Sequence, residues 1–105
     1  QQDEETLEFI LQSKFPGMKE NALKQWIGLF LDLQLKAQNG EITTKAVDLR
    51  GILGAMKAIH RGLQPALAVK MGVVNKNFDV FEKEIVEDVV RTRIPREWTK
   101  EDVYE

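Results

Sequence analysis

Arg50 is the residue whose position in the sequence most clearly suggests a chemical role. It belongs to the run Asp48-Leu49-Arg50-Gly51, at which we expect a helix to begin. The Asp48 carboxylate is suited to act as the N-cap, which accepts a hydrogen bond from a backbone N–H of the first turn. A positive side chain in that turn is disfavoured by the helix dipole, yet beside free N–H groups it can stabilise a bound phosphate. Arg50 therefore has two open interpretations: a phosphate-binding residue, or one half of a structural salt bridge.

Other residue patterns that carry enzyme chemistry are absent from the sequence. It contains no GxxxxGK[ST] phosphate loop, no GxGxxG nucleotide-binding turn and no HExxH zinc motif. With no cysteine, one histidine (His60) and one serine (Ser13), it cannot form a cysteine zinc site, a thiol nucleophile or a useful serine–histidine pair. We therefore predict no catalytic residue and no metal site in this chain.

The remaining charged residues have simpler explanations. His60 lies near the end of a predicted helix and is expected to be a cap or a surface residue. Arg91 and Arg93 fall in the last turn of another helix, where cations suit the negative end of the dipole. Four carboxylates share that helix and are expected to form a solvated face rather than a catalytic pair: Glu82, Glu84, Glu87 and Asp88.

The composition argues against binding to nucleic acids and membranes. The 15 basic and 17 acidic residues give a net charge of −2, whereas domains that bind nucleic acid usually carry a basic excess. No apolar run is long enough to span a bilayer and no secretion signal is present. The absence of cysteine fits a reducing compartment, so a cytoplasmic location is expected.

Apolar spacing and helix-end signals predict an all-α fold, a small bundle of about five helices. The helices are expected at residues 3–13, 19–38, from a start between 43 and 48 to about 60, 65–71 and 79–93. The second is predicted to be central because of its wide apolar stripe of Leu23, Trp26, Ile27, Phe30, Leu31 and Leu33. The fifth is expected to bury Phe81, Ile85, Val86, Val89 and Val90.

Two glycines lie inside the third predicted helix. Gly51 and Gly54 each cost roughly 1 kcal/mol relative to alanine at such positions. Their presence therefore requires a reason, either close packing of another backbone or a ligand. Gly62 is expected to end this helix and Pro65 to begin the next.

We expect residues 1–95 to form one domain and residues 96–105 to form a charged C-terminal tail. The spacing of Thr99 and Asp102 is typical of a capping box and indicates one further helical turn in that tail. The chain starts at Gln1 rather than Met, from which we expect it to be a piece of a longer protein.

Residues 43–65 (TTKAVDLRGILGAMKAIHRGLQP) resemble the C-terminal helical lid of MoxR-like and CbbQ/NorQ-like AAA+ ATPases. In those families a Ser-x-Arg element opens a lid helix that ends in a glycine before a further short helix. Residues 4–11 (EETLEFIL) resemble the first lid helix, and residues 88–95 (DVVRTRIP) resemble the closing helix. The resemblance covers most of the chain and implies that residues 1–95 form an AAA+ lid subdomain.

The resemblance also implies which residue meets the nucleotide. Counted back from Gly62, CbbQ-like spacing places the sensor-2 arginine, which contacts the nucleotide phosphates, at Arg50 and the family's capping serine at Asp48. MoxR-like spacing instead aligns Thr43-Thr44-Lys45 with the Ser-Pro-Arg element, so that Lys45 is the second candidate. Lysine can meet a phosphate as a point charge but not with a planar fork. Neither register reproduces the family's serine.

What the resemblance implies is one part of an ATPase. ATP and Mg²⁺ would be bound by the parent protein, whose N-terminal ATPase core would precede this lid, and the fragment alone should be inactive without a bound cofactor. Its other partners would be neighbouring subunits of a ring oligomer and, in some relatives, a von Willebrand factor A domain protein. The lid would couple the nucleotide state to chaperone-like remodelling of a partner complex.

Two other functions fit parts of the sequence. A stand-alone helical protein-interaction module would explain every helix but not the position of Arg50. A helix-turn-helix DNA-binding domain could use Lys57 and Arg61, although the balanced charge disfavours it.

Overall fold

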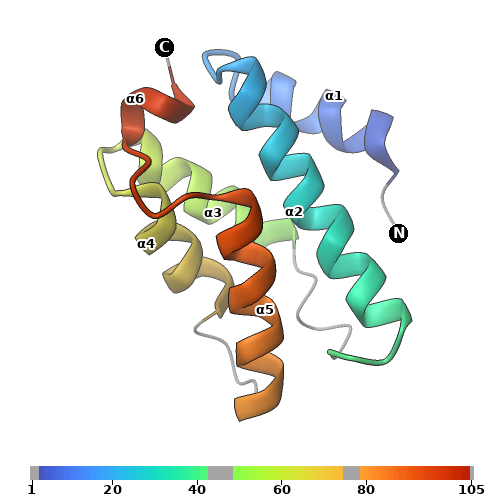
Figure 1. Ribbon diagram of the computed structural model, residues 1–105. Coiled ribbons are helices and arrows are strands. Elements are labelled where there is room, and N and C mark those ends of the chain that lie inside the picture. Colours follow the sequence, from blue (N-terminus) through green and yellow to red (C-terminus); the bar gives the residue numbers. More distant parts are fainter. Residues whose placement is uncertain (1–2, 43–48, 75–78, 105) are drawn as a thin grey trace.

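Helices make up 76% of the residues that the computed structural model describes, which are residues 3–42, 49–74 and 79–104. No β-strand occurs in this part of the chain, and five of its six helices have seven residues or more, so the predicted all-α bundle is confirmed. The elements are α1 (Glu4–Lys14), α2 (Glu20–Gln38), α3 (Leu49–His60), α4 (Pro65–Val69) with its π-helical continuation η2 (Lys70–Val74), α5 (Val80–Arg93) and α6 (Lys100–Val103) (Figure 1).

Carboxylate caps begin two of these helices. Asp3 accepts a hydrogen bond from the Thr6 N–H at 2.7 Å, and this bond lowers the pKa of the Asp3 carboxyl. Asp79 accepts from the Glu82 N–H at 2.8 Å, while the Glu82 carboxylate accepts from the Asp79 N–H at 3.3 Å. Helix α5 thus starts with a reciprocal capping box that satisfies two otherwise unpaired N–H groups.

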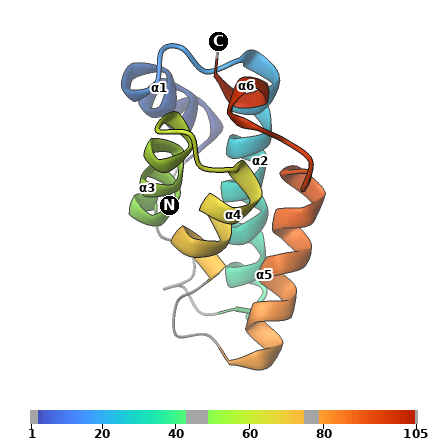
Figure 2. The ribbon, with the colours of Figure 1, turned by 90° about the vertical axis from the view of Figure 1, so that its left-hand side faces the viewer.

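Helix α2 forms the centre of the bundle. Helix α1 packs on it near its start, and α5 runs antiparallel beside it (Figure 1). Helix α4 lies between α3 and α5 (Figure 2). The predicted apolar stripe of α2 is buried with the exception of Leu31, which is half-buried. The buried residues of α2 are Ala22, Leu23, Trp26, Ile27, Leu29, Phe30 and Leu33.

The prediction that Phe81 is buried in the core is wrong. Its side chain is 77% exposed, and that of Val80 is 70% exposed. Both residues lie in the first turn of α5, at the end of the helix that reaches beyond α4 (Figure 2). Further along α5, Val86, Val89 and Val90 are buried as expected, whereas Ile85 is half-buried against the core.

Arg93 joins α5 to α2 through an ion pair with Asp32. Its Nε donates to Oδ2 of Asp32 at 2.8 Å and its Nη2 donates to Oδ1 at 3.4 Å. These bonds raise the pKa of the Arg93 guanidinium. A Cβ on Gly28 would lie 2.5 Å from that guanidinium, so the glycine one turn before Asp32 leaves the space in which Arg93 lies. The helix-end explanation of Arg93 was therefore incomplete, whereas Arg91 pairs with Asp88 within α5.

The C-terminal tail packs onto the bundle. The predicted helical turn is present as α6, and the Asp102 carboxylate accepts from the Thr99 N–H at 2.8 Å. Val103 is fully buried, and its carbonyl accepts from the Lys19 N–H at 2.8 Å. Tyr104 is 5% exposed and its hydroxyl donates to the Met56 carbonyl oxygen at 2.9 Å.

We expect Tyr104→Phe to destabilise the fold in a pH-dependent way. Loss of the hydrogen bond to Met56 should lower the free energy of unfolding by about 1 kcal/mol near neutral pH. Burial raises the pKa of Tyr104 to about 12, against about 10 in the unfolded chain. The Tyr104 hydroxyl therefore stays protonated to higher pH in the folded state than in the unfolded chain. Its contribution to the free energy of unfolding is complete below about pH 10 and is lost as the pH rises towards about 12.

The measurement is urea unfolding of both proteins near neutral pH and at about pH 11, where the stability difference between them should shrink. Tyr104 is the single tyrosine, so the ultraviolet absorbance of tyrosinate reports its titration directly. An unchanged stability difference, or titration at the ordinary value, would contradict the prediction.

Candidate functional site

Arg50 lies in the first turn of α3, and its side chain is exposed. It also makes an interaction within the chain, so the structural interpretation of this arginine stays open beside the ligand-binding one. The second candidate, Lys45, and the expected N-cap, Asp48, both lie in 43–48, outside the described residues.

An exposed stripe runs along α3 from Arg50 through Gly54 and Lys57 to Arg61. Residues separated by three or four positions share one side of a helix. Arg61 follows the last residue of α3, but its N–H still donates to the Lys57 carbonyl at 3.2 Å and so continues the turn. The stripe therefore carries a positive side chain at each end and a bare stretch of backbone at Gly54.

The backbone of η2 comes very close to α3. A Cβ on Gly72 would lie 2.7 Å from the Gly51 carbonyl oxygen and 3.4 Å from Cβ of Ala55. Gly72 of η2 thus lies against the Gly51 carbonyl and the small side chain of Ala55. Gly54 differs, because a Cβ there would have nothing within 4 Å.

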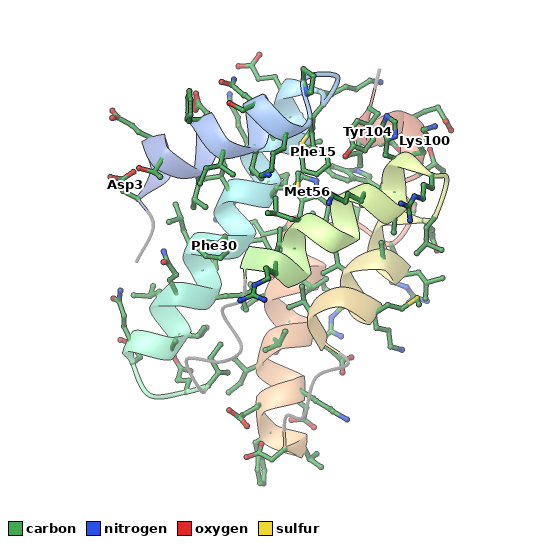
Figure 3. The ribbon with its side chains drawn as sticks, turned by 180° about the vertical axis from the view of Figure 1, so that it is seen from behind. Asp3, Phe15, Phe30, Met56, Lys100 and Tyr104 are labelled. Carbon is green, nitrogen blue, oxygen red and sulfur yellow. The ribbon has the colours of Figure 1, made fainter. Side chains whose placement is uncertain are left out.

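A hollow of about 370 Å³ lies where α1 and α3 end, next to the C-terminal segment. Figure 3 shows Phe15 and Tyr104 beside each other in this region. The ring of His60 meets the ring of Tyr104 edge-on, with 5.0 Å between the centroids. We call this feature the basic hollow; it is lined by Lys14, Phe15, Pro16, Gly17, Lys57, His60, Arg61 and Tyr104.

The basic hollow is positively charged. The described residues of its lining include two lysines, an arginine and a histidine but no carboxylate. In the part of the chain that the structure describes, Lys14, Lys57 and Arg61 form no ion pair. The arrangement can therefore attract an anionic group, whereas it offers nothing to a metal cation.

The sequence predicted only part of this hollow. Lys57 and Arg61 are the residues that a DNA-binding helix would use, and the expected surface position of His60 agrees with its exposed side chain. Sequence reasoning missed Lys14 and Tyr104 as members, because no local pattern shows that the ends of α1 and α3 line the same hollow. The one available signal was the presence of cations near the ends of two separate helices.

The acidic residues form no comparable site. Across residues 3–42, 49–74 and 79–104, no group of three or more His, Cys, Asp or Glu side chains could hold a metal ion. Glu82 belongs to the capping box of α5, and Asp88 pairs with Arg91. Two of the four carboxylates noted along this helix thus have structural partners.

In comparisons with protein-family models, with curated proteins and with solved structures, none matched this chain. Among the helices that the structure describes, none is both long and apolar enough to cross a membrane.

Two glycine substitutions should have opposite effects on stability. Gly72→Ala forces its new Cβ against the Gly51 carbonyl and should lower the free energy of unfolding by about 1–3 kcal/mol. Gly54→Ala meets open space and should raise it by about 0.5–1 kcal/mol, because alanine is the better helix former. Urea unfolding followed by the fluorescence of the buried Trp26 measures both.

Each variant serves as the control for the other, since both add one methyl group to a helical glycine. A destabilised Gly54→Ala protein would show that Gly54 has a packing role, and an unaffected Gly72→Ala protein would show that α3 and η2 can separate without cost.

Proposed function

We propose that this chain is the helical lid of a MoxR-like AAA+ ATPase and that Arg50 contacts the phosphates of ATP held by the ATPase core. The observation that carries the proposal is the exposed Arg50 side chain in the first turn of a helix of the length and order that the resemblance requires. Helix α3 closes at Gly62, whose φ is +112°, and α4 begins at Pro65.

The proposed role of Arg50 is electrostatic. A guanidinium forms charge-assisted hydrogen bonds to phosphate oxygens, which are stronger than bonds between neutral groups. The N-terminal end of α3 adds backbone N–H groups and the positive end of the helix dipole. Such a contact would offset the unfavourable placement of a cation in the first turn.

The packing of the chain supports movement of the lid as one body. A single core cluster contains buried residues from α1 to α6, including Leu7 of α1, Val69 of α4 and Val103 of α6. A cluster of this kind has no internal hinge among the residues that the structure places, so a change at Arg50 would shift the whole bundle. The lid could in this way pass the difference between ATP and ADP to a ring and to its partner complex.

The test is Arg50→Ala in the full-length ATPase that contains this lid. Loss of a charge-assisted hydrogen bond costs about 1.5–3 kcal/mol, so kcat/KM for ATP should fall by about 10- to 100-fold. The free energy of unfolding should change little, because the side chain is exposed. Arg96→Ala is the matched control, since Arg96 is also exposed and should leave ATP turnover unchanged.

Lys45→Ala decides between the two sensor registers. If Lys45 rather than Arg50 contacts the phosphates, Lys45→Ala should lower ATP turnover and Arg50→Ala should not. Wild-type turnover in both variants would refute the phosphate contact, and a full-length sequence without a phosphate loop before residue 1 would refute the lid assignment itself.

The rival interpretation is a helical protein-interaction module without nucleotide. It requires no role for Arg50, and it predicts that Arg50→Ala changes neither ATP turnover nor nucleotide affinity. The exposed basic hollow is compatible with either interpretation.

A further inference from the structure

We propose that the basic hollow, together with the neighbouring Gly54 surface of α3, is a docking site for an acidic segment of a partner protein. Carboxylates of that segment would meet Lys14, Lys57 and Arg61, and an apolar side chain between them would rest on the rings of Phe15 and Tyr104. This site does not depend on whether Arg50 contacts ATP.

The first argument is the pairing of charges. Four cations elsewhere in the structure are paired with carboxylates, in Lys24–Glu20 and Lys36–Glu41 and in the two ion pairs of α5. Other exposed lysines, such as Lys70 and Lys83, form no ion pair among the described residues, so an unpaired cation alone does not mark a site. Among the described residues that line the basic hollow, no carboxylate compensates the three long cationic side chains. The chain as a whole has a net charge of −2, so this positive charge is confined to one place on the surface and would attract an anionic ligand there.

Helix dipoles explain only part of that concentration. Helices α1 and α3 both end at the hollow, with Lys14 and His60 as their last residues. Each C-terminal helix end carries about half a negative charge, so the two ends offset about one of the three positive charges. About two positive charges remain for a ligand.

The second argument is the apolar floor. Phe15 and Tyr104 are 8% and 5% exposed, so each presents a small part of its ring to the lining, with 6.4 Å between the ring centroids. Tyr104 keeps its hydroxyl on the Met56 carbonyl, so the ring is held in place. A free inorganic anion gains nothing from these rings, whereas a peptide can place an apolar side chain against them. The volume of about 370 Å³ lies at the lower end of ligand pockets, about 300–1,000 Å³.

The third argument is Gly54. It is exposed in the middle of α3 and has open space where a side chain would project, so internal packing in the described residues gives no reason for this glycine. It precedes Lys57 by one turn on the same side of the helix. A missing side chain there lets a partner backbone approach α3 while its carboxylates reach the cations.

A protein segment fits these features better than a nucleic acid. Phosphate backbones bind to extended basic surfaces, whereas the chain as a whole is acidic and the basic hollow is confined to one end of the bundle. A short acidic segment needs only this local charge and also uses the apolar floor.

The experiment measures fluorescence anisotropy of a labelled peptide built of glutamate and leucine, titrated with the folded chain at low salt. The double variant Lys57→Glu/Arg61→Glu should weaken binding by about tenfold or more, because each reversal replaces an attraction with a repulsion. The matched control is Lys70→Glu/Lys83→Glu, which makes the same change of net charge at exposed lysines outside the hollow. It should weaken binding by less than about threefold, through long-range electrostatics alone.

A second variant tests the shape of the site without altering charge. Gly54→Leu should weaken binding of the peptide, because the new side chain occupies the space that the partner backbone would approach. The urea unfolding curve should show an intact fold, since a Cβ at this position meets open space. Equal losses in the two charge-reversal variants would overturn the proposal, as would the absence of peptide binding. Tighter binding of duplex DNA, or of inorganic phosphate, than of the peptide would also overturn it.

Discussion

Burial of helix α2 is the constraint on which the rest of the structure depends. Trp26, Leu29 and Leu33 are fully buried, and α1, α5 and α6 all pack against this helix. The Trp26 side chain shows how strongly burial dominates, because its Nε1–H is buried without an acceptor among the described residues. An unpaired donor costs about 1–3 kcal/mol, whereas removing about 150–250 Å² of tryptophan surface from water stabilises the fold by about 4–6 kcal/mol.

This arrangement determines which surface is left for function. Helix α3 packs against α4 and η2, and the close contact of Gly72 with the Gly51 carbonyl fixes that side. Tyr104 holds the end of α3 through the carbonyl of Met56. The opposite side of α3 is used by none of these contacts, and it carries the exposed stripe from Arg50 to Arg61. The candidate site is thus the surface that core packing leaves open.

Local patterns predicted the parts of this fold that depend on local physics. Apolar spacing located the helices, and the Thr99–Asp102 spacing located α6, because both signals act within a few residues. Periodicity also assigned Phe81 to the buried face of α5, but it could not show that the first turn of α5 reaches beyond α4. The contact of Arg93 with Asp32 spans 61 residues, and the placement of Lys14 and Lys57 around one hollow likewise depends on how the helices pack. The spacing of neighbouring residues in the sequence does not indicate such long-range pairings.

The two ends of α3 present different electrostatic problems. Arg50 is a cation at the positive end of the dipole, where it is unfavourable, whereas Lys57 lies at the negative end, where it is favourable. The position of Arg50 is therefore the less favourable of the two, and its interaction within the chain keeps a structural role open beside the proposed phosphate contact. The basic hollow differs because the described residues of its lining include no carboxylate. The separation of eleven positions between Arg50 and Arg61 corresponds to about 16 Å along a helix. If a phosphate is bound at one end and an acidic partner at the other, one rigid helix connects them, and movement of the bundle displaces both contacts together.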